Sequence, residues 1–248
     1  MAMMDLLIKN GSLLDGLGSP AVRRDIGVTG DRIAAIAPDL SHVSARQVID
    51  AAGLTVAPGF IDIHSHTDFT ILRNARAESK IRQGITTELV GNCGFTAAPV
   101  REKHSGALMD YLVNTTMLTE EEQESWRWPS QADFMETVRE RGTGINLAFL
   151  VGHGTLRVAV MGLEKREAGP EEIKQMQHLL EEELARGIWG FSTGLQYEPA
   201  RFAGKDEIVA LAETAAAFRA LYATHMKSES ATLLESLADS IEASRRSG

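Results

Sequence analysis

Residues 58–68 read PGFIDIHSHTD, a short apolar segment that ends in two histidines. Its apolar part, Phe60 to His64, is typical of a buried β-strand. Side chains alternate between the two faces of a strand, so His64 and His66, two residues apart, project from the same face. This spacing allows both imidazoles to bind one metal ion. An isolated pair of this kind is also compatible with one buried structural histidine and one surface histidine.

Apolar segments with strand character recur along the rest of the chain and alternate with segments of helical periodicity. This alternation predicts βα units that form a parallel sheet. In such a sheet, functional residues gather at the carboxyl ends of the strands. A closed barrel needs eight strands, so five predict the N-terminal portion of a longer barrel protein. The predicted strands are Phe60 to His64, Ile85 to Val90, Ile145 to Val151, Ile188 to Ser192 and Leu221 to Thr224.

Residues 1–57 differ from residues 58–248 in their pattern of apolar and turn residues. Four short strand-like pieces lie between Leu6 and Asp50, separated by turn residues, and Gly30-Asp31 suits a two-residue hairpin. We therefore expect a small β-domain over residues 1–57 and a (β/α) barrel portion over residues 58–248. The stretch from Val100 to Pro129 shows no clear periodicity, which favours an irregular lid or surface excursion.

Composition narrows the class of protein. A length of 248 residues suits one α/β barrel, and 44% hydrophobic residues suffice for a sizeable core. The net charge of −9 disfavours a nucleic-acid partner. No apolar run approaches the roughly 18 residues that span a bilayer, and the first ten residues lack the features of a signal peptide. With one cysteine and no internal disulfide, we expect a soluble, reduced, cytoplasmic protein without a membrane partner; its oligomeric state is open.

Two more candidate metal ligands follow predicted strands. Cys93 comes directly after the second strand, and the glycines at 91 and 94 favour a loop there. His225 ends the fifth strand in the same way. Zinc binds both thiolate and imidazole ligands. The alternatives are a small buried apolar side chain for Cys93 and a lone structural histidine for His225.

Three other polar residues are candidates for supporting roles. His153 ends the third strand between two glycines, which suggests close approach of the backbone to another group. We expect it to contact substrate or to support the site. Asp62 lies on the same strand face as the histidines, and Asp68 follows them, so either could orient an imidazole through its other nitrogen. Asp68 could instead be an ordinary helix cap.

Five segments together carry a family resemblance: PGFIDIHSHTD, GITTELVGNCGF, GHGTLR, GFSTGLQYEPA and YATHMKSE. Over essentially its whole length the chain resembles the amidohydrolase superfamily, and specifically its N-acyl-D-amino-acid deacylase (D-aminoacylase) branch. The first segment alone is shared with dihydroorotases and hydantoinases. The cysteine of GNCG and the run STGLQYEP are much more specific to the deacylases.

The resemblance implies a (β/α)8 barrel and a small β-sandwich built from both chain ends. It implies that His64, His66, Cys93 and His225 hold one or two zinc ions and that Tyr197 helps bind the substrate carboxylate. The fourth strand has no lysine to be carboxylated, so Cys93 would supply the anionic ligand. A further histidine, the catalytic aspartate and a substrate-binding arginine are expected beyond residue 248.

The function expected from the resemblance is zinc-dependent hydrolysis of an N-acyl-D-amino acid, a small-molecule substrate, to a carboxylate and a D-amino acid. One alternative is a cyclic amidase of the dihydroorotase or hydantoinase kind, against which Cys93 and the lysine-free fourth strand argue. Another is a non-catalytic fragment or interaction module of the same fold. The intact set of candidate ligands argues against decay of the parent protein, but it does not establish that residues 1–248 are active alone.

Overall fold

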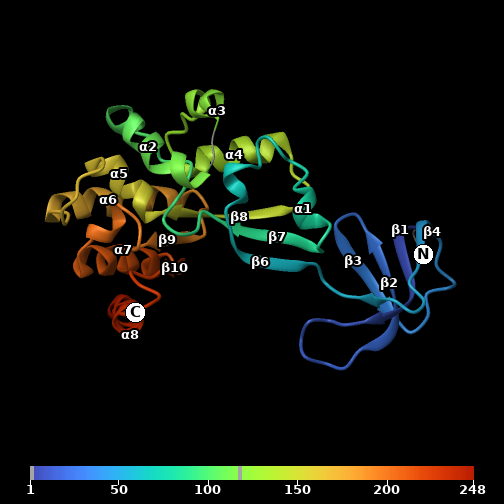
Figure 1. Ribbon diagram of the computed structural model, residues 1–248. Coiled ribbons are helices and arrows are strands. Elements are labelled where there is room, and N and C mark those ends of the chain that lie inside the picture. The colour runs from blue at the N-terminus through green and yellow to red at the C-terminus, as the bar shows by residue number, and fades with distance from the viewer. Residues whose placement is uncertain (1–2, 117–118) are drawn as a thin grey trace. The chain divides into compact units, whose positions relative to one another are not determined.

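The computed structural model describes residues 3–116 and 119–248. The chain divides into two compact units, Met1–Gly59 and Phe60–Gly248 (Figure 1). Among the described residues, no helix combines the length and the apolar character needed to cross a membrane.

The N-terminal unit is a mixed β-sheet with the strand order β3-β2-β1-β4, in which β5 also pairs with β1. β1 and β2 are antiparallel, as are β2 and β3, whereas β4 and β5 run parallel to β1. Met4, Leu7, Leu40 and Val43 form its small core. The strands are β1 (Met4–Leu13), β2 (Val22–Thr29), β3 (Arg32–Ala37), β4 (Ala45–Asp50) and β5 (Thr55–Val56).

The second unit contains a five-stranded parallel sheet in the order β10-β9-β8-β7-β6. Each strand pairs with its neighbour in sequence, which is the order of a (β/α) barrel. The structure confirms the five predicted strands, with ends shifted by at most two residues. They are β6 (Phe60–Ser65), β7 (Ile85–Val90), β8 (Asn146–Gly152), β9 (Gly190–Gly194) and β10 (Leu221–His225).

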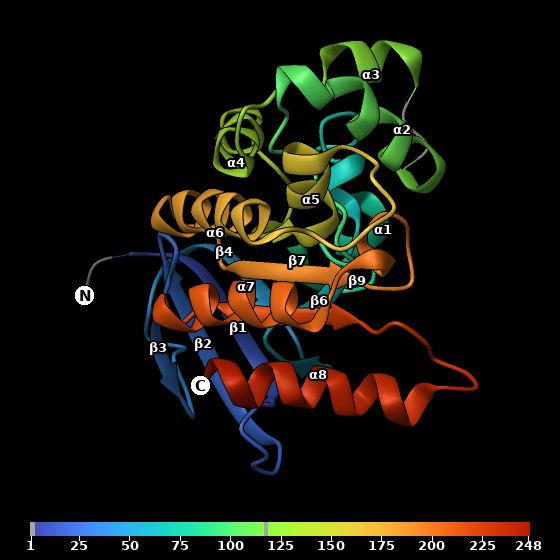
Figure 2. The same ribbon diagram turned by 90° about the vertical axis from the view of Figure 1, so that its left-hand side faces the viewer.

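Helices follow the strands and cover one side of this sheet (Figure 2). Most of their buried apolar residues pack with those of the sheet in one core, which includes Phe134, Leu156, Met176, Leu180 and Leu211. Proline opens one of these helices at its first position, as the sequence predicts. They are α1 (Glu78–Ile81), α4 (Gln131–Arg141), α5 (His153–Met161), α6 (Pro170–Ala185), α7 (Lys205–Ala217) and α8 (Leu233–Ser247).

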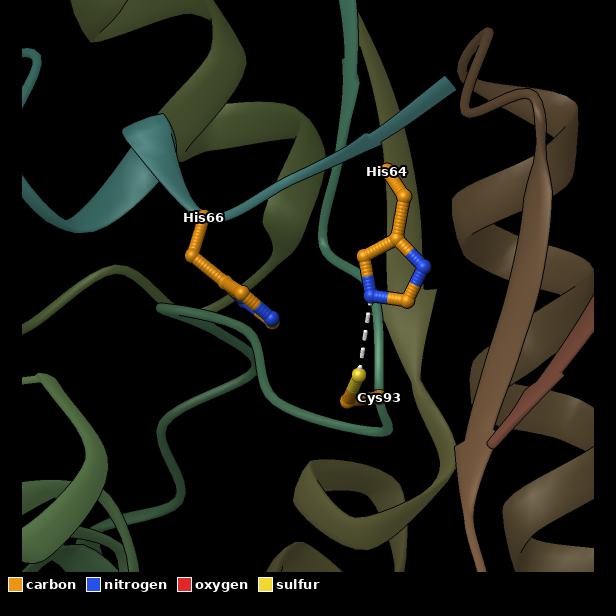
Figure 3. Close-up of side chains that lie close together, drawn as sticks. All are labelled: His64, His66 and Cys93. Atoms are coloured by element: carbon orange, nitrogen blue, oxygen red, sulfur yellow. Dashed lines mark hydrogen bonds between the residues drawn. The ribbon is translucent and has the colours of Figure 1, made fainter. Parts of the chain in front are cut away.

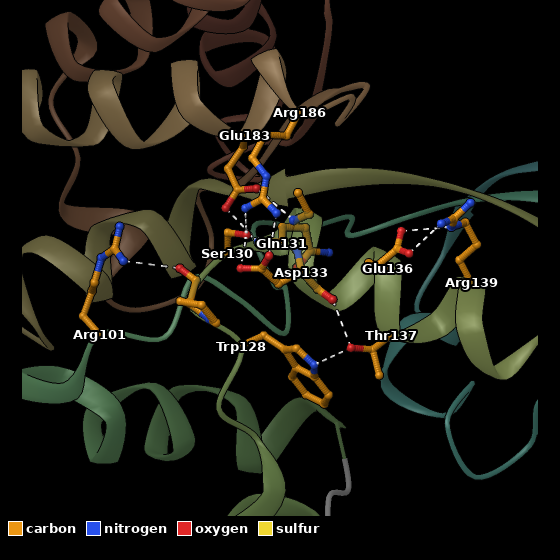
Figure 4. Close-up of polar contacts among 12 residues, drawn as sticks. Arg101, Trp128, Ser130, Gln131, Asp133, Glu136, Thr137, Arg139, Glu183 and Arg186 are labelled. Carbon is orange, nitrogen blue, oxygen red and sulfur yellow. Dashed lines mark hydrogen bonds and ion pairs between the residues drawn. The ribbon is translucent and has the colours of Figure 1, made fainter.

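The start of α4 is fastened to the end of α6 (Figure 4). Ser130 caps α4 by accepting a hydrogen bond from the backbone N–H of Asp133, as its sequence position predicts. The Glu183 carboxylate of α6 accepts two more backbone N–H groups of the first turn, those of Gln131 and Ala132, at 2.7 and 3.0 Å. Three backbone donors that a helix leaves unpaired are thereby satisfied.

The stretch from Val100 to Pro129 is more regular than the sequence suggests. It contains α2 (Ser105–Thr116) and α3 (Glu120–Ser125), with residues 117 and 118 outside the described residues. Leu108 and Trp126 are buried in the main core. The expectation of an irregular excursion is wrong because apolar contacts with the rest of the unit stabilise helices whose own sequence periodicity is weak.

The parallel sheet is open within the described residues. β6 and β10 each pair with one strand only. Strands of a closed parallel barrel are buried on both faces, yet Phe60, Ile61 and Ile63 of β6 are 66%, 67% and 72% exposed. Together, the strand order and these exposed side chains are those of part of a TIM barrel.

Candidate metal centre

Two histidines and the cysteine lie close together at the carboxyl end of β6 (Figure 3). One side-chain ligand atom from each of His64, His66 and Cys93 lies within 4.8 Å of the others. The shortest separation, 3.1 Å, is between Nε2 of His64 and Sγ of Cys93. The imidazole rings of His64 and His66 are 5.8 Å apart, at an interplanar angle of 71°. These orientations allow the three side chains to face one ion.

Cys93 owes its position to an unusual loop conformation directly after β7. Its φ of 56° lies in the left-handed region, where residues with a side chain are uncommon, and it is flanked by Gly91 and Gly94 with φ values of 83° and 75°. A side chain at Gly94 would meet the backbone nitrogen of Gly194 at 2.9 Å. The loop therefore passes tightly against β9, and the Cys93 side chain is only 7% exposed.

His225 ends β10 and approaches Cys93 from that strand. Its Nδ1 is 3.6 Å from Cys93 Sγ, and its Nε2 is 2.9 Å from Oε1 of Gln196. Among the described residues, His225 is not part of the compact group formed by His64, His66 and Cys93. The thiol is thus within 3.6 Å of a nitrogen of His64 and of a nitrogen of His225. Gln196 fixes the direction of the His225 ring, a role that its sequence position did not suggest.

The donor set fits zinc by its chemistry and its spacing. Two ligands of a tetrahedral zinc, one sulfur and one nitrogen, are about 3.5 Å apart when Zn–S is about 2.3 Å and Zn–N about 2.0 Å. The observed sulfur–nitrogen separations of 3.1 and 3.6 Å bracket that value. In addition, Nδ1 of His66 is buried and has no hydrogen-bond partner among the described residues. Thiolate and imidazole together are ligands that zinc prefers.

Burial affects the titration of two members of the group. It raises the pKa of the Cys93 thiol to about 11, with a further contribution from the nearby Glu229 carboxylate. It lowers the pKa of His66, and the neighbouring His64 adds to that effect. Without a cation the group therefore favours a neutral thiol and a neutral imidazole. A bound cation would stabilise the thiolate that metal binding requires.

Asp62 does not orient an imidazole in the structure. Its Oδ1 accepts a hydrogen bond from the backbone N–H of His64 at 3.1 Å, and its Oδ2 is 3.0 Å from Nζ of Lys80. Lys80 also lies 2.6 Å from Oε1 of Glu88, which is fully buried on β7. Asp62 therefore accepts a hydrogen bond from the backbone of β6. Lys80 of α1 pairs with Asp62 on β6 and with Glu88 on β7. No local pattern predicts this role for Lys80, because α1 has a single turn and no amphipathic pattern.

Asp68 is fully buried in a single helical turn, Thr67–Phe69. Burial raises the pKa of its carboxyl to about 8, in spite of neighbouring backbone N–H groups that lower it. Neither carboxyl oxygen has a side-chain partner among the described residues. The expected contact between an aspartate and an imidazole is thus absent at Asp68 as well.

His153 lies away from the metal-binding group and is enclosed by the protein. Its ring is fully buried at the start of α5, with Nε2 2.7 Å from Oε1 of Glu207 on α7. Arg157 approaches the other carboxylate oxygen at 2.5 Å. Although burial raises the pKa of Glu207, hydrogen bonds from these two residues lower it overall. The ring thus joins α5 to α7 through Nε2, and a substrate contact at His153 stays a prediction from the sequence.

Tyr197 lies beside His225. Its hydroxyl is 3.4 Å from Nδ1 of His225, and its ring centroid is 5.0 Å from that ring and from the ring of Phe95. Burial raises the pKa of the phenol, so the hydroxyl stays a hydrogen-bond donor at neutral pH. Tyr197 and Phe95 line a surface cleft together with Lys165. The position of Tyr197 at the carboxyl edge of the sheet is suited to contact with a small molecule.

The fold and the site define a class of protein: part of a (β/α) barrel with nitrogen and sulfur metal ligands at the carboxyl ends of its strands. The profile of the amidohydrolase family matches residues 47–245. The chain belongs to the amidohydrolase family.

Relatives of known activity narrow the likeness to one branch. The chain is 42% identical to a D-aminoacylase of Alcaligenes xylosoxydans xylosoxydans over 97% of its own length and 48% of the relative. It is 37% identical to an N-acyl-D-glutamate deacylase of the same organism over 99% of its length and 48% of the relative. The chain therefore spans about half the length of the curated relatives it matches.

Solved structures agree with this assignment. A D-aminoacylase structure matches 98% of this chain and 50% of its own with a TM-score of 0.88 at 38% identity. The N-acyl-D-glutamate deacylase of Bordetella bronchiseptica, solved with zinc and a phosphonate inhibitor, matches all of this chain and 50% of its own with a TM-score of 0.89 at 35% identity. An L-hydantoinase of Arthrobacter aurescens, at 20% identity and a TM-score of 0.58, shares the fold.

Proposed function

We propose that this chain supplies the metal-binding part of a zinc-dependent N-acyl-D-amino-acid deacylase. The observation that carries the proposal is that the Cys93 thiol lies 3.1 Å from Nε2 of His64 and 3.6 Å from Nδ1 of His225. A bound zinc would polarise the amide carbonyl and lower the pKa of a water molecule toward about 7. The protein's own contribution is to hold the ligands at fixed separations and to keep the thiol out of bulk solvent.

Cys93 is proposed to serve two cation positions. His64 and His66 form a compact group with it, and Nδ1 of His225 lies 3.6 Å from it without belonging to that group. A thiolate in this place can be shared, so the ligand set accommodates one or two ions. A solved relative is described as having a binuclear metal centre, with one-metal activation and second-metal attenuation. β9, with the sequence GFSTG, offers no lysine for a bridging carbamate, which leaves the thiolate as the anionic ligand of the set.

Tyr197 is proposed to bind the substrate carboxylate. Its hydroxyl lies 3.4 Å from Nδ1 of His225 and belongs to a side chain that lines a surface cleft. A phenol that remains protonated can donate to a carboxylate, and the ring packed against Phe95 holds the donor in place. A substrate carboxylate bound there would place the adjacent amide toward the metal ligands.

The general base and the remaining ligands are proposed to come from residues outside 1–248. The metal-binding group contains no carboxylate among the described residues, and the matching relatives are about twice as long as the chain. An aspartate positioned near the metal would take a proton from water and later return it to the leaving amine.

Deacylation assays test the proposal. We expect zinc-loaded residues 1–248 alone to be inactive toward N-acetyl-D-methionine and N-acetyl-D-glutamate, because loss of a general base removes about 10² to 10⁴ in rate. A chimaera that continues into the C-terminal half of the 42% identical D-aminoacylase should hydrolyse the D-isomers and not the L-isomers. A chimaera that folds, binds zinc and opens hydantoin rings instead would favour the cyclic amidase alternative.

A further inference from the structure

We propose that Ser192 on β9 and Tyr111 on α2 are positioning residues that hold the Cys93 loop in its left-handed conformation. They act on backbone groups of the two glycines that flank Asn92 and Cys93. The inference rests on the proposed metal-binding role of Cys93 and extends it to side chains that do not touch the metal-binding group.

Ser192 binds both ends of the loop. Its Oγ accepts a hydrogen bond from the backbone N–H of Gly94 at 2.9 Å and donates to the carbonyl oxygen of Gly91 at 2.5 Å. The side chain is fully buried, so water cannot replace either bond. One hydroxyl on a neighbouring strand therefore fixes the distance between the residues that precede and follow Asn92 and Cys93.

Tyr111 binds the loop from the helical layer. Its hydroxyl donates to the carbonyl oxygen of Gly94 at 3.1 Å, and the backbone N–H of Thr155 donates to the same oxygen at 3.2 Å. The phenol ring stacks on Phe95 at a centroid distance of 4.8 Å and is 7% exposed. Both polar groups of Gly94, its N–H and its carbonyl, are thus bound by elements far away in the sequence.

The conformation of Cys93 explains why such support matters. A non-glycine residue at a φ of 56° is disfavoured by contacts of its Cβ with the backbone, so the surrounding structure must hold it there. Return of the residue to negative φ would turn the thiol away from His64 and His225. Ser192 and Tyr111 therefore determine where the thiol points, and the metal affinity should depend on them.

Cys93 is the single cysteine of the chain, so its reactivity can be followed without labels or further substitutions. The test compares Ser192→Ala, Tyr111→Phe and the wild-type chain in two measurements. The first is the rate of alkylation of the metal-free protein by iodoacetamide. The second is titration with Co²⁺, which reports affinity and the thiolate-to-cobalt absorption band. Thr214→Val is the matched control, because it removes a buried hydroxyl that donates to a carbonyl within α7.

We expect about tenfold faster alkylation and about tenfold weaker Co²⁺ binding in Ser192→Ala, because this variant loses both buried hydrogen bonds that hold the loop. Tyr111→Phe keeps the ring and should show the same changes at smaller size. The thiolate-to-cobalt band should weaken at saturation in both variants and stay at the wild-type value in Thr214→Val.

Wild-type alkylation rates and Co²⁺ spectra in folded Ser192→Ala and Tyr111→Phe would overturn the proposal. If Ser192→Ala fails to fold, Tyr111→Phe decides alone, because it removes one oxygen atom and leaves the packing intact. Absence of Co²⁺ binding in the wild-type chain would contradict the proposed metal function, whereas the alkylation rates would still test whether the two residues hold the loop.

Discussion

The thiol of Cys93 lies 3.1 Å from Nε2 of His64, although the two residues are 29 positions apart and belong to different βα units. Parallel pairing of β6 with β7 brings the carboxyl ends of both strands to one edge of the sheet. The left-handed turn at Cys93 then directs the sulfur toward the histidines. Zinc binds a soft anionic donor together with imidazole nitrogens, whereas magnesium and calcium prefer oxygen ligands.

Removal of the thiol should remove most of the zinc. We expect purified Cys93→Ala to retain a small fraction of the wild-type zinc content and Cys93→Ser to retain an intermediate one, because a hydroxyl is a weaker ligand than a thiolate. Elemental analysis after dialysis measures this. His178→Ala is the control, since His178 is exposed on α6 and pairs with Glu182. Equal zinc in Cys93→Ala and wild type would exclude Cys93 as a ligand.

Zinc affinity should rise with pH, because the pKa of the Cys93 thiol is high. Burial raises the pKa of the metal-free thiol to about 11, and binding requires the thiolate, so a proton is released on binding. Below pH 11 the apparent zinc affinity should therefore rise about tenfold per pH unit from this residue alone. Burial lowers the pKa of His66, so protons compete with the metal at this imidazole less than at an ordinary one. Calorimetry in two buffers of different ionisation enthalpy counts the released protons.

The same titration in Cys93→Ala should release about one proton fewer per bound ion than the wild-type chain between pH 7 and 9. An unchanged number of released protons in this variant would assign the proton to another group.

Glu207 should stabilise the fold without affecting metal content. Its carboxylate is buried between His153 and Arg157, so Glu207→Ala leaves an unpaired buried charge and should lower the free energy of unfolding by about 3 kcal/mol or more. Urea denaturation of this variant and of Glu213→Ala, an exposed position on the same helix, measures the difference. Zinc content per folded molecule should stay at the wild-type value in both variants.

The pKa of Glu207 is lowered in the folded protein, so its contribution to stability is present above the pKa of the unfolded state. That contribution is lost as the pH falls through the lower folded value. Wild type should therefore lose its stability advantage over Glu207→Ala on acidification. An advantage that grows toward low pH would show that Glu207 is not ionised in the fold.

The sequence predicted the parallel sheet well, because apolar runs bounded by polar residues are local signals. It also indicated His64, His66, Cys93 and His225, since position after a strand is enough to place a residue at the carboxyl edge. The structure brings the first three together and places Nδ1 of His225 3.6 Å from the thiol, outside that group. The metal-binding role of all four stays a prediction.

The sequence did not predict which side chains contact each other. His153 follows a strand just as His225 does, but the helix that begins at His153 turns its ring toward Glu207, 54 residues further on. Asp62 shares a face with the histidines, yet Lys80 from a one-turn helix takes its carboxylate. Such contacts depend on how helices pack on the sheet, and no local pattern encodes that geometry. The cytoplasmic location likewise stays a prediction from the sequence.

X-ray absorption at the zinc edge of the zinc-loaded chain tests the proposed centre most directly. With one zinc ion bound per chain, the spectrum should contain one sulfur neighbour at about 2.3 Å and two or three nitrogen neighbours at about 2.0 Å. The sulfur contribution should disappear in Cys93→Ala, whose single thiol is gone. A wild-type spectrum with oxygen and nitrogen neighbours alone would contradict a centre built around Cys93.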